Sequence, residues 1–181
     1  MQPIKRLIEW LEKNSTVDHY LFTSSQLHAL LPELSALAFK TLLSRAVSNG
    51  HLIRVCRGLY MYKRYPRTGL LLFHAAAQLR ANEFNYISLE TALSDLGIIS
   101  QIPLNYISIM SSGRSSTIAC GKFGTIDFVH TTQEACDVAN QLVYDDECRM
   151  WRAMPALALR DIKATRRSSD LIDWEIANEL I

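Results

Sequence analysis

The chain has 181 residues, of which 49% are hydrophobic and 20% are charged. This composition, without a long low-complexity tract, predicts a folded protein of one compact domain or two small ones and excludes a disordered chain. The charged N-terminal segment argues against a signal peptide. The longest apolar run, at 70–77, contains His74 and is too short to cross a bilayer. We therefore expect a soluble, cytoplasmic protein.

The net charge of +1 conceals an uneven distribution along the chain. Residues 1–67 carry ten Lys and Arg against four Asp and Glu, whereas the remainder carries nine against fourteen. A basic part joined to an acidic part favours two tasks, in which the basic part meets a polyanion and the acidic part meets a basic protein. The alternative is that both parts have ordinary solvated surfaces.

The four cysteines are Cys56, Cys120, Cys136 and Cys148. None forms a C-x-x-C pair, and their spacing matches no zinc finger or ribbon. We expect them to be reduced and structural, since free cysteine is commonly buried. A metal site built from the last three and His130 is the open alternative. The prediction is that the protein binds neither a metal nor a cofactor.

The first third of the chain reads as three helices and a β-hairpin. In order, the predicted elements are a helix at 4–14, a β-like segment at 20–22, helices at 25–31 and 35–49, and two strands at 51–55 and 59–63. Thr23 or Ser24 would cap the second helix, and Ser35 would cap the third. Gly50 would end the third helix, and Gly58 would accept the positive φ that a tight hairpin turn requires.

The third predicted helix has two distinct faces. Its apolar face comprises Phe39, Leu42, Leu43, Ala46 and Val47, and its polar face comprises Lys40, Thr41, Ser44, Arg45 and Ser48. A basic, hydroxyl-rich face suits the major groove of DNA, where Arg and Lys reach guanine or phosphate and Ser and Thr bond to bases or phosphates. The hairpin adds the cations Arg54, Arg57, Lys63 and Arg64 as phosphate contacts. This predicts a winged helix-turn-helix that binds double-stranded DNA; the alternative is a winged helix that docks proteins.

A domain boundary is expected at 65–69, where Pro and Gly occur and the charge balance changes. Beyond it we predict helices at 70–84, 89–96, 132–144, 156–166 and 170–180, and strands at 86–88, 106–110, 116–120 and 125–129. Ser88 and Asp170 would cap helices, and Pro155 would begin one. The fold class is therefore α+β: a winged helix-turn-helix at 1–66, followed by a mixed α/β domain at 67–181.

Four motifs occur in series along the chain: RGLY at 57–60, YISLETAL with GII at 86–99, the hairpin around Gly124 with Phe128 and His130, and AMPALALRD at 153–161. In this order they resemble the motifs of the AbiEi-type antitoxin family. The resemblance implies a two-domain antitoxin whose N-terminal winged helix binds operator DNA and represses its own operon. It also implies a C-terminal domain that counteracts a nucleotidyltransferase toxin. The alternative is a stand-alone winged-helix regulator whose C-terminal domain senses a ligand or mediates dimerisation.

No familiar catalytic motif is found, and we predict that the chain is not an enzyme. The segment 111–116 could form a phosphate nest, but its place between two predicted strands favours a polar turn. The acids at 145–147 are expected to face water. Asp95 and Asp127 lack the lysine of a usual nuclease arrangement.

The sequence also allows predictions for one histidine and for the three tryptophans. His74, within an apolar helix, is expected to be packed and hydrogen-bonded rather than to bind a ligand. Trp10, Trp151 and Trp174 are expected to be core or interdomain anchors, with Trp174 as the candidate for a protein contact.

Overall fold

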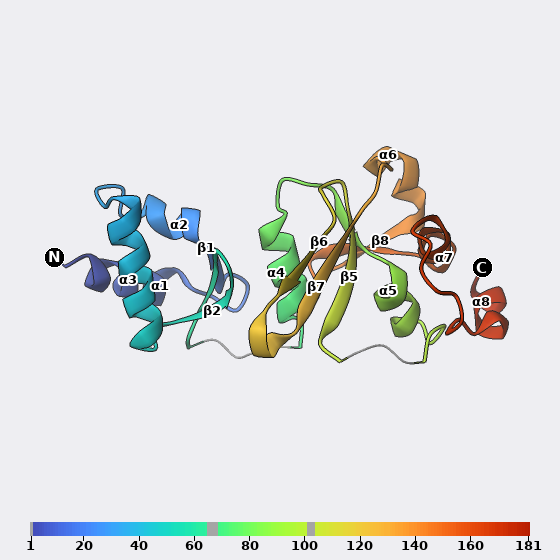
Figure 1. Cartoon of the computed structure of the whole chain (residues 1–181), viewed down its shortest axis with the longest axis horizontal. Coiled ribbons are helices and arrows are strands. Elements are labelled where there is room, and N and C mark those ends of the chain that lie inside the picture. Colours follow the sequence, from blue (N-terminus) through green and yellow to red (C-terminus); the bar gives the residue numbers. More distant parts are fainter. Residues whose placement is uncertain (1, 65–68, 101–103) are drawn as a thin grey trace. The chain divides into compact units, whose positions relative to one another are not determined.

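The computed structural model describes residues 2–64, 69–100 and 104–181. The chain divides into two compact units, Met1–Gly69 and Leu70–Ile181 (Figure 1). Of the predicted boundary at 65–69, all but Gly69 lies outside the described residues.

The first unit combines helices with a three-stranded antiparallel sheet in which β3 lies between β1 and β2. Its elements are α1 (Pro3–Asn14), β1 (Leu21–Thr23), α2 (Ser24–Ala29), α3 (Ala36–Ser48), β2 (Leu52–Cys56) and β3 (Leu59–Tyr62). A helical pair followed by a β-hairpin is the order of a winged helix-turn-helix. The predicted N-terminal fold is therefore confirmed.

Local side-chain chemistry sets the helix ends in this unit. Thr23 accepts a hydrogen bond from the amide of Gln26, whose side chain accepts one from the amide of Thr23, so a complete capping box begins α2. Ser35 caps α3 by accepting from the amide of Ala38 at 3.3 Å. After α3, Gly50 has a φ of +71°, which a residue with a side chain rarely adopts. The predicted caps and stop are confirmed.

The core of the first unit forms between the apolar faces of its helices and its sheet. It comprises Leu7, Leu11, Phe22, Leu27, Leu31, Phe39, Leu42, Leu43, Ala46, Leu52 and Tyr62. The apolar face predicted for α3 is buried there, with Val47 partly buried beside it. Because this face is buried, the opposite, polar face of α3 is turned to solvent.

The second unit is built on a six-stranded mixed sheet. Its elements are α4 (Leu71–Leu79), β4 (Asn85–Ile87), α5 (Leu89–Asp95), β5 (Tyr106–Ser111), β6 (Ser116–Ala119), η1 (Gly121–Phe123), β7 (Thr125–His130), α6 (Ala135–Val138), η2 (Ala139–Gln141), β8 (Leu142–Asp145), β9 (Met150–Ala153), α7 (Pro155–Ala164) and α8 (Trp174–Leu180). The strand order is β6-β7-β5-β4-β9-β8, with β5–β7 and β4–β9 parallel and the other pairs antiparallel. This confirms a mixed α/β second domain.

Helices cover both faces of this sheet, α4 on one and α5 with α7 on the other (Figure 1). Phe128 and Asp127 are adjacent residues of β7, so their side chains point to opposite faces of the sheet. The ring of Phe128 lies under Arg80, which follows α4. The carboxylate of Asp127 pairs with Arg167, which follows α7.

The helix predicted at 132–144 is wrong. Only the short α6 and η2 form there, and the chain then enters β8, which pairs with β9. Val143 and Tyr144 are types favoured in strands, and Tyr144 faces Trp151 across the ladder with ring centroids 5.3 Å apart. Cross-strand pairing therefore outweighs the local helical pattern. It also places Asp145 in a strand rather than in the predicted loop.

Two predictions for the C-terminal segment also need correction. The N-cap of α8 is Asp173, which accepts from the amides of Glu175 and Ile176, whereas Asp170 is bonded to Ser168. The tryptophans of this unit are not core residues, because Trp151 is 44% exposed and Trp174 is 43% exposed.

Candidate nucleic-acid interface

The polar face of α3 is the first part of the candidate interface. All four of its predicted DNA-reading side chains, Lys40, Thr41, Ser44 and Arg45, are exposed. They lie together because positions three and four apart occupy neighbouring places on a helix surface. Thr41 donates its hydroxyl proton to the carbonyl of Leu37 at 3.1 Å, which leaves the hydroxyl oxygen as an acceptor toward solvent.

Leu37 is a further member of this face that the periodicity did not single out. Its side chain is 76% exposed, one turn before Thr41. With Thr41 and Arg45 it lines an open groove of about 700 Å³ beside the start of α1. An exposed apolar side chain on a recognition helix can contact the methyl group of thymine. The signal was present in the sequence as a leucine outside the buried stripe.

The tip of the β-hairpin carries two cations. Gly58 has a φ of +80°, and its carbonyl accepts from the amide of Ser24, which ties the turn to the start of α2. Arg54 and Arg57 are exposed on either side of the bulge that precedes the turn. The Arg54 Nε donates to the carbonyl of Cys56 at 3.4 Å, so this side chain lies along the tip.

The other two predicted wing cations lie at the base of the hairpin. The amide of Lys63 donates to the carbonyl of His51 at 3.4 Å, at the end opposite the turn. Arg64 lies 3.1 Å from Glu12 of α1, with 71% and 40% of the two side chains exposed. An ion pair this exposed contributes little energy, so a phosphate can replace Glu12 as the partner of Arg64. The four cations are thus divided between the tip and the base.

In the second unit, two of the family-like motifs meet in a buried network. Asp161 is fully buried and accepts from the Ser88 hydroxyl at 2.7 Å, the Tyr86 hydroxyl at 3.1 Å and Gln133 Nε2 at 3.1 Å. Burial raises the pKa of Asp161, and burial followed by the charge of Asp161 raises the pKa of Tyr86. Ser88 occupies the N-cap position of α5, but its hydroxyl bonds Asp161 and does not cap the helix. Tyr86, Ser88 and Asp161 are fully buried and Gln133 is partly buried, so the network links α7 to β4 in the core of the unit.

Asp95 and Asp127, the two candidate nuclease carboxylates, belong to separate ion-pair clusters. Arg152 pairs with Asp95 and Asp145, and Arg167 pairs with Asp127 and Glu90. Arg167 binds both carboxylate oxygens of Glu90 at 2.8 Å. Each of the two acids therefore shares an arginine with a second acid and lies apart from the other.

The remaining residues considered as possible ligands are His74 and the four cysteines. His74 is buried and donates from Nε2 to the carbonyl of Glu147 at 2.7 Å, as expected. Cys56, Cys120 and Cys148 are buried, and Cys136 is exposed. Over the described ranges, no three His, Cys, Asp or Glu side chains are grouped to hold a metal ion. None of the helices described is both long enough and apolar enough to cross a membrane.

Comparisons with known proteins agree with the N-terminal fold. Residues 17–63 match the model of a family described as "Transcriptional regulator, AbiEi antitoxin". This segment runs from before β1 to the end of the hairpin, so it includes α3 and the RGLY motif, and the expected resemblance is confirmed there. The match supports an antitoxin-type regulator as the class of protein. The other three motifs lie outside the matched residues.

Similarity to a solved structure extends along most of the chain. The crystal structure of the RV2827C protein from Mycobacterium tuberculosis superposes with a TM-score of 0.51 at 15% identity, covering 92% of this chain and 53% of that one. At 15% identity, the similarity concerns the fold alone. The chain spans about half of that protein's length, since it covers 53% of it. No curated protein matches the chain.

Proposed function

We propose that this protein is an antitoxin-type regulator that binds operator DNA through α3 and the wing and represses its own operon. One observation carries the proposal: the exposed, basic, hydroxyl-rich face of α3 lies within the segment that matches the AbiEi regulator family. A face of this chemistry on the third helix of a winged helix-turn-helix is suited to the major groove.

Each side chain of the interface has a proposed role. Lys40 and Arg45 reach guanine or phosphate, and Ser44 hydrogen-bonds within the groove. Thr41 accepts from a base amino group, because its own proton is held by the carbonyl of Leu37. Arg54 and Arg57 at the tip and Arg64 at the base bind phosphates, which gives affinity without sequence information.

The test is fluorescence anisotropy of the full chain with two duplexes, one from upstream of its gene and one scrambled, at two salt concentrations. We expect tight binding to the native duplex and weak, salt-sensitive binding to the scrambled duplex. Absence of binding to both at low salt would show that the winged helix docks another kind of partner.

Variants separate the roles of α3 and the wing. Lys40→Ala and Arg45→Ala should weaken binding to the native duplex more than to the scrambled one. Arg57→Ala should weaken both and reduce the slope of log affinity against log salt by about one. Lys122→Ala, which removes an exposed cation of the second unit, is the matched control. An Arg57 variant with unchanged affinity and slope would remove the wing tip from the interface.

For the second unit, we propose that it counteracts a nucleotidyltransferase toxin. Its acidic excess and the exposed side chains Val143, Tyr144 and Trp151 on the β8–β9 hairpin support a protein contact. The test is rescue of growth when the chain is co-expressed with a nucleotidyltransferase encoded beside it. Loss of rescue with Trp151→Ala, but not with Trp174→Ala, would place the contact on the hairpin, and the reverse would place it at α8.

The second candidate is a stand-alone regulator whose second unit senses a ligand. An open polar cleft in the second unit, lined by residues that include Arg80, Arg114 and His130, favours it. A metabolic enzyme encoded beside the chain, together with no rescue of any nucleotidyltransferase, would support this candidate instead of the antitoxin.

A further inference from the structure

A polar cleft lies on the α4 face of the second unit. It is found where the parallel strands β5 and β7 end, with Ser111 and His130 opposite one another in the register. The cleft has a volume of about 720 Å³ and is lined by Arg80, Glu83, Ser112, Gly113, Arg114, Ser115 and His130. In open sheets with parallel strands, the carboxyl ends of those strands are a common place for small ligands.

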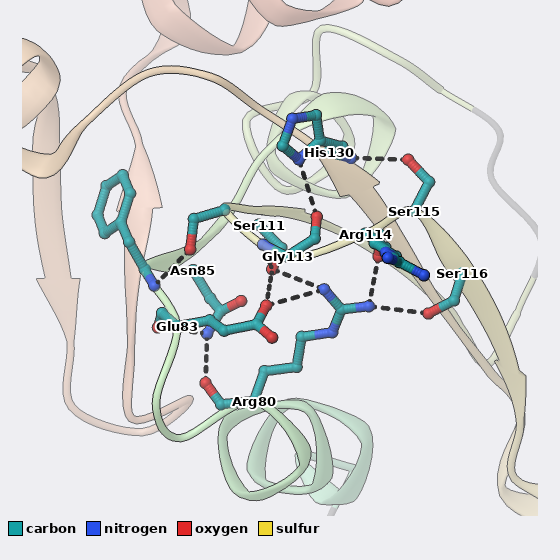
Figure 2. Close-up of polar contacts among 11 residues, drawn as sticks. Arg80, Glu83, Asn85, Ser111, Gly113, Arg114, Ser115, Ser116 and His130 are labelled. Carbon is teal, nitrogen blue, oxygen red and sulfur yellow. Dashed lines mark hydrogen bonds and ion pairs between the residues drawn. The ribbon is translucent and has the colours of Figure 1, made fainter.

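Arg80 organises the floor of this cleft (Figure 2). Its side chain is only 11% exposed, and its guanidinium lies 4.2 Å from the centre of the Phe128 ring. The guanidinium donates to Glu83 Oε2 at 3.0 Å, Ser111 Oγ at 3.0 Å, Ser116 Oγ at 2.9 Å and the carbonyl of Arg114 at 2.5 Å. A single arginine thus fixes the end of β5, the start of β6 and the loop between them.

The loop that joins β5 to β6 is pressed closely onto this arginine. A Cβ atom at Gly113 would lie 1.7 Å from Glu83 Oε2 and 2.2 Å from Arg80 Nη1, so only glycine fits without displacement. On its other side, His130 donates from Nδ1 to the carbonyl of Gly113 and from its amide to Ser115 Oγ, both at 2.9 Å (Figure 2). The loop is therefore held before any ligand arrives.

Hydrogen-bond donors remain free in this fixed loop. The Oγ atoms of Ser112 and Ser115 accept from the amides of Phe84 and His130, so both hydroxyl protons can be donated outward. The charge of Arg80 is balanced by Glu83, whereas the exposed guanidinium of Arg114 has no partner among the residues described. The cleft thus carries an uncompensated positive charge within an otherwise acidic unit.

We propose that this cleft binds a phosphate group, carried either by a mononucleotide or by the 5′ end of a nucleic-acid strand. Arg114 pairs with two phosphate oxygens, and Ser112 and Ser115 donate to the others. The polar turn predicted at 111–116 forms at 112–115, between the last residue of β5 and the first of β6, and the proposal adds a binding role to that turn. His130 donates from Nδ1 to the loop, which leaves its Nε2 for a contact with a sugar hydroxyl or a phosphate oxygen.

Isothermal titration calorimetry of the full chain tests this at constant ionic strength. The probes are inorganic phosphate, AMP, and a trinucleotide with either a 5′-phosphate or a 5′-hydroxyl. We expect phosphate and AMP to bind and the 5′-phosphorylated trinucleotide to bind more tightly than its 5′-hydroxyl twin. Tighter binding of AMP identifies a free nucleotide as the source, and tighter binding of the phosphorylated trinucleotide identifies a strand end.

Charge-matched variants locate the site. Arg114→Ala should weaken phosphate and AMP binding about tenfold or more, because it removes a charged hydrogen-bond donor. Lys122→Ala removes an exposed cation beyond the opposite end of β6 and should leave binding unchanged. Circular dichroism of both variants checks that each is folded. Equal weakening in the two variants, or no binding of any probe, would overturn the proposal.

A second measurement does not depend on a variant. Addition of inorganic phosphate should shift the backbone amide resonances of Gly113, Ser115 and His130 in a two-dimensional NMR spectrum. Shifts confined to α3 would show that phosphate binds the DNA-facing surface instead, and would overturn the proposed site.

Discussion

Asp161 is the residue whose environment departs most from that of an ordinary aspartate. It is fully buried, and burial raises its pKa despite the hydrogen bonds from Ser88, Tyr86 and Gln133. The folded chain therefore holds this proton to a higher pH than the unfolded chain, in which an aspartate has a pKa of about 4. The stabilisation linked to this group is complete below the unfolded pKa and is lost as the pH rises through the folded pKa.

This predicts a pH-dependent difference between the wild type and Asp161→Asn. The wild type should gain free energy of unfolding relative to the variant as the pH falls from neutral toward the unfolded pKa. Urea unfolding followed by circular dichroism at several pH values measures the difference.

The control for this prediction is Asp145→Asn, for which the trend should be the opposite. Burial alone would raise the pKa of Asp145, but hydrogen bonds from Cys148 and Arg152 outweigh it and lower the pKa. A group of this kind adds stability above the unfolded pKa and loses it as the pH falls through the folded pKa. The same trend in both variants would contradict these assignments.

Residue-scale prediction from the sequence succeeded only for partners close along the chain, and not at every cap, since Ser88 and Asp170 do not cap their predicted helices. The caps at Thr23 and Ser35 depend on amides three residues ahead, so they could be identified directly. Tyr86 and Asp161 are 75 positions apart, and Arg80 is 31 positions from Ser111. Such contacts follow from the tertiary fold, so neither the buried network nor the floor of the cleft could be predicted from spacing.

At the scale of elements, α2 is a short helix that depends on its cap. It has only six residues, too few for helix propensity to stabilise it alone. Thr23→Ala should lower the free energy of unfolding by about 1 kcal/mol, because it leaves the Gln26 amide without its acceptor. Thr23→Ser keeps the acceptor oxygen and should cost distinctly less. Urea unfolding compares the three proteins, and an alanine variant as stable as the wild type would show that the cap is not needed.

Element prediction failed mainly at one edge of the large sheet. The segments of β8 and β9 are each four residues long, and their pairing partners are one another and β4. Short strands of this kind carry little periodicity of their own. In contrast, α1, α3 and the wing have long amphipathic or turn patterns, and their predicted bounds differ from the structure by only a residue or two at each end.

At the scale of the whole molecule, the dominant feature is the opposition of charge between the two parts of the chain. The total is +1, although the first 67 residues hold ten basic and four acidic side chains. Copies of such a chain attract one another through unlike parts when little salt is present, and salt screens this attraction.

We therefore expect self-association at low ionic strength that salt reverses. Light scattering at increasing sodium chloride concentration measures it. Addition of duplex DNA at low salt should also reduce association, because it covers the basic surface of the first unit. Association that instead grows with salt would indicate an apolar contact rather than an electrostatic one.

Whole-molecule prediction was sound for the class and the order of the parts, and incomplete for strand pairing. Local patterns were enough to place a winged helix before a mixed α/β domain. The parallel pairing of β4 with β9 joins residues far apart in the chain, for example Tyr86 with Trp151. No pattern within either strand specifies that partner, since register and neighbour are set when the sheet assembles.

The close packing of Gly113 against Glu83 and Arg80 has a consequence for finding the same cleft in the sequences of other proteins. Because the loop lies directly on the pair formed by Arg80 and Glu83, we expect chains with the same cleft to combine R-x-x-E after a helix with S-x-G-R at the end of a strand. Neither half is distinctive by itself. The expectation is that the two halves occur together and in this order, whatever DNA-binding module precedes them.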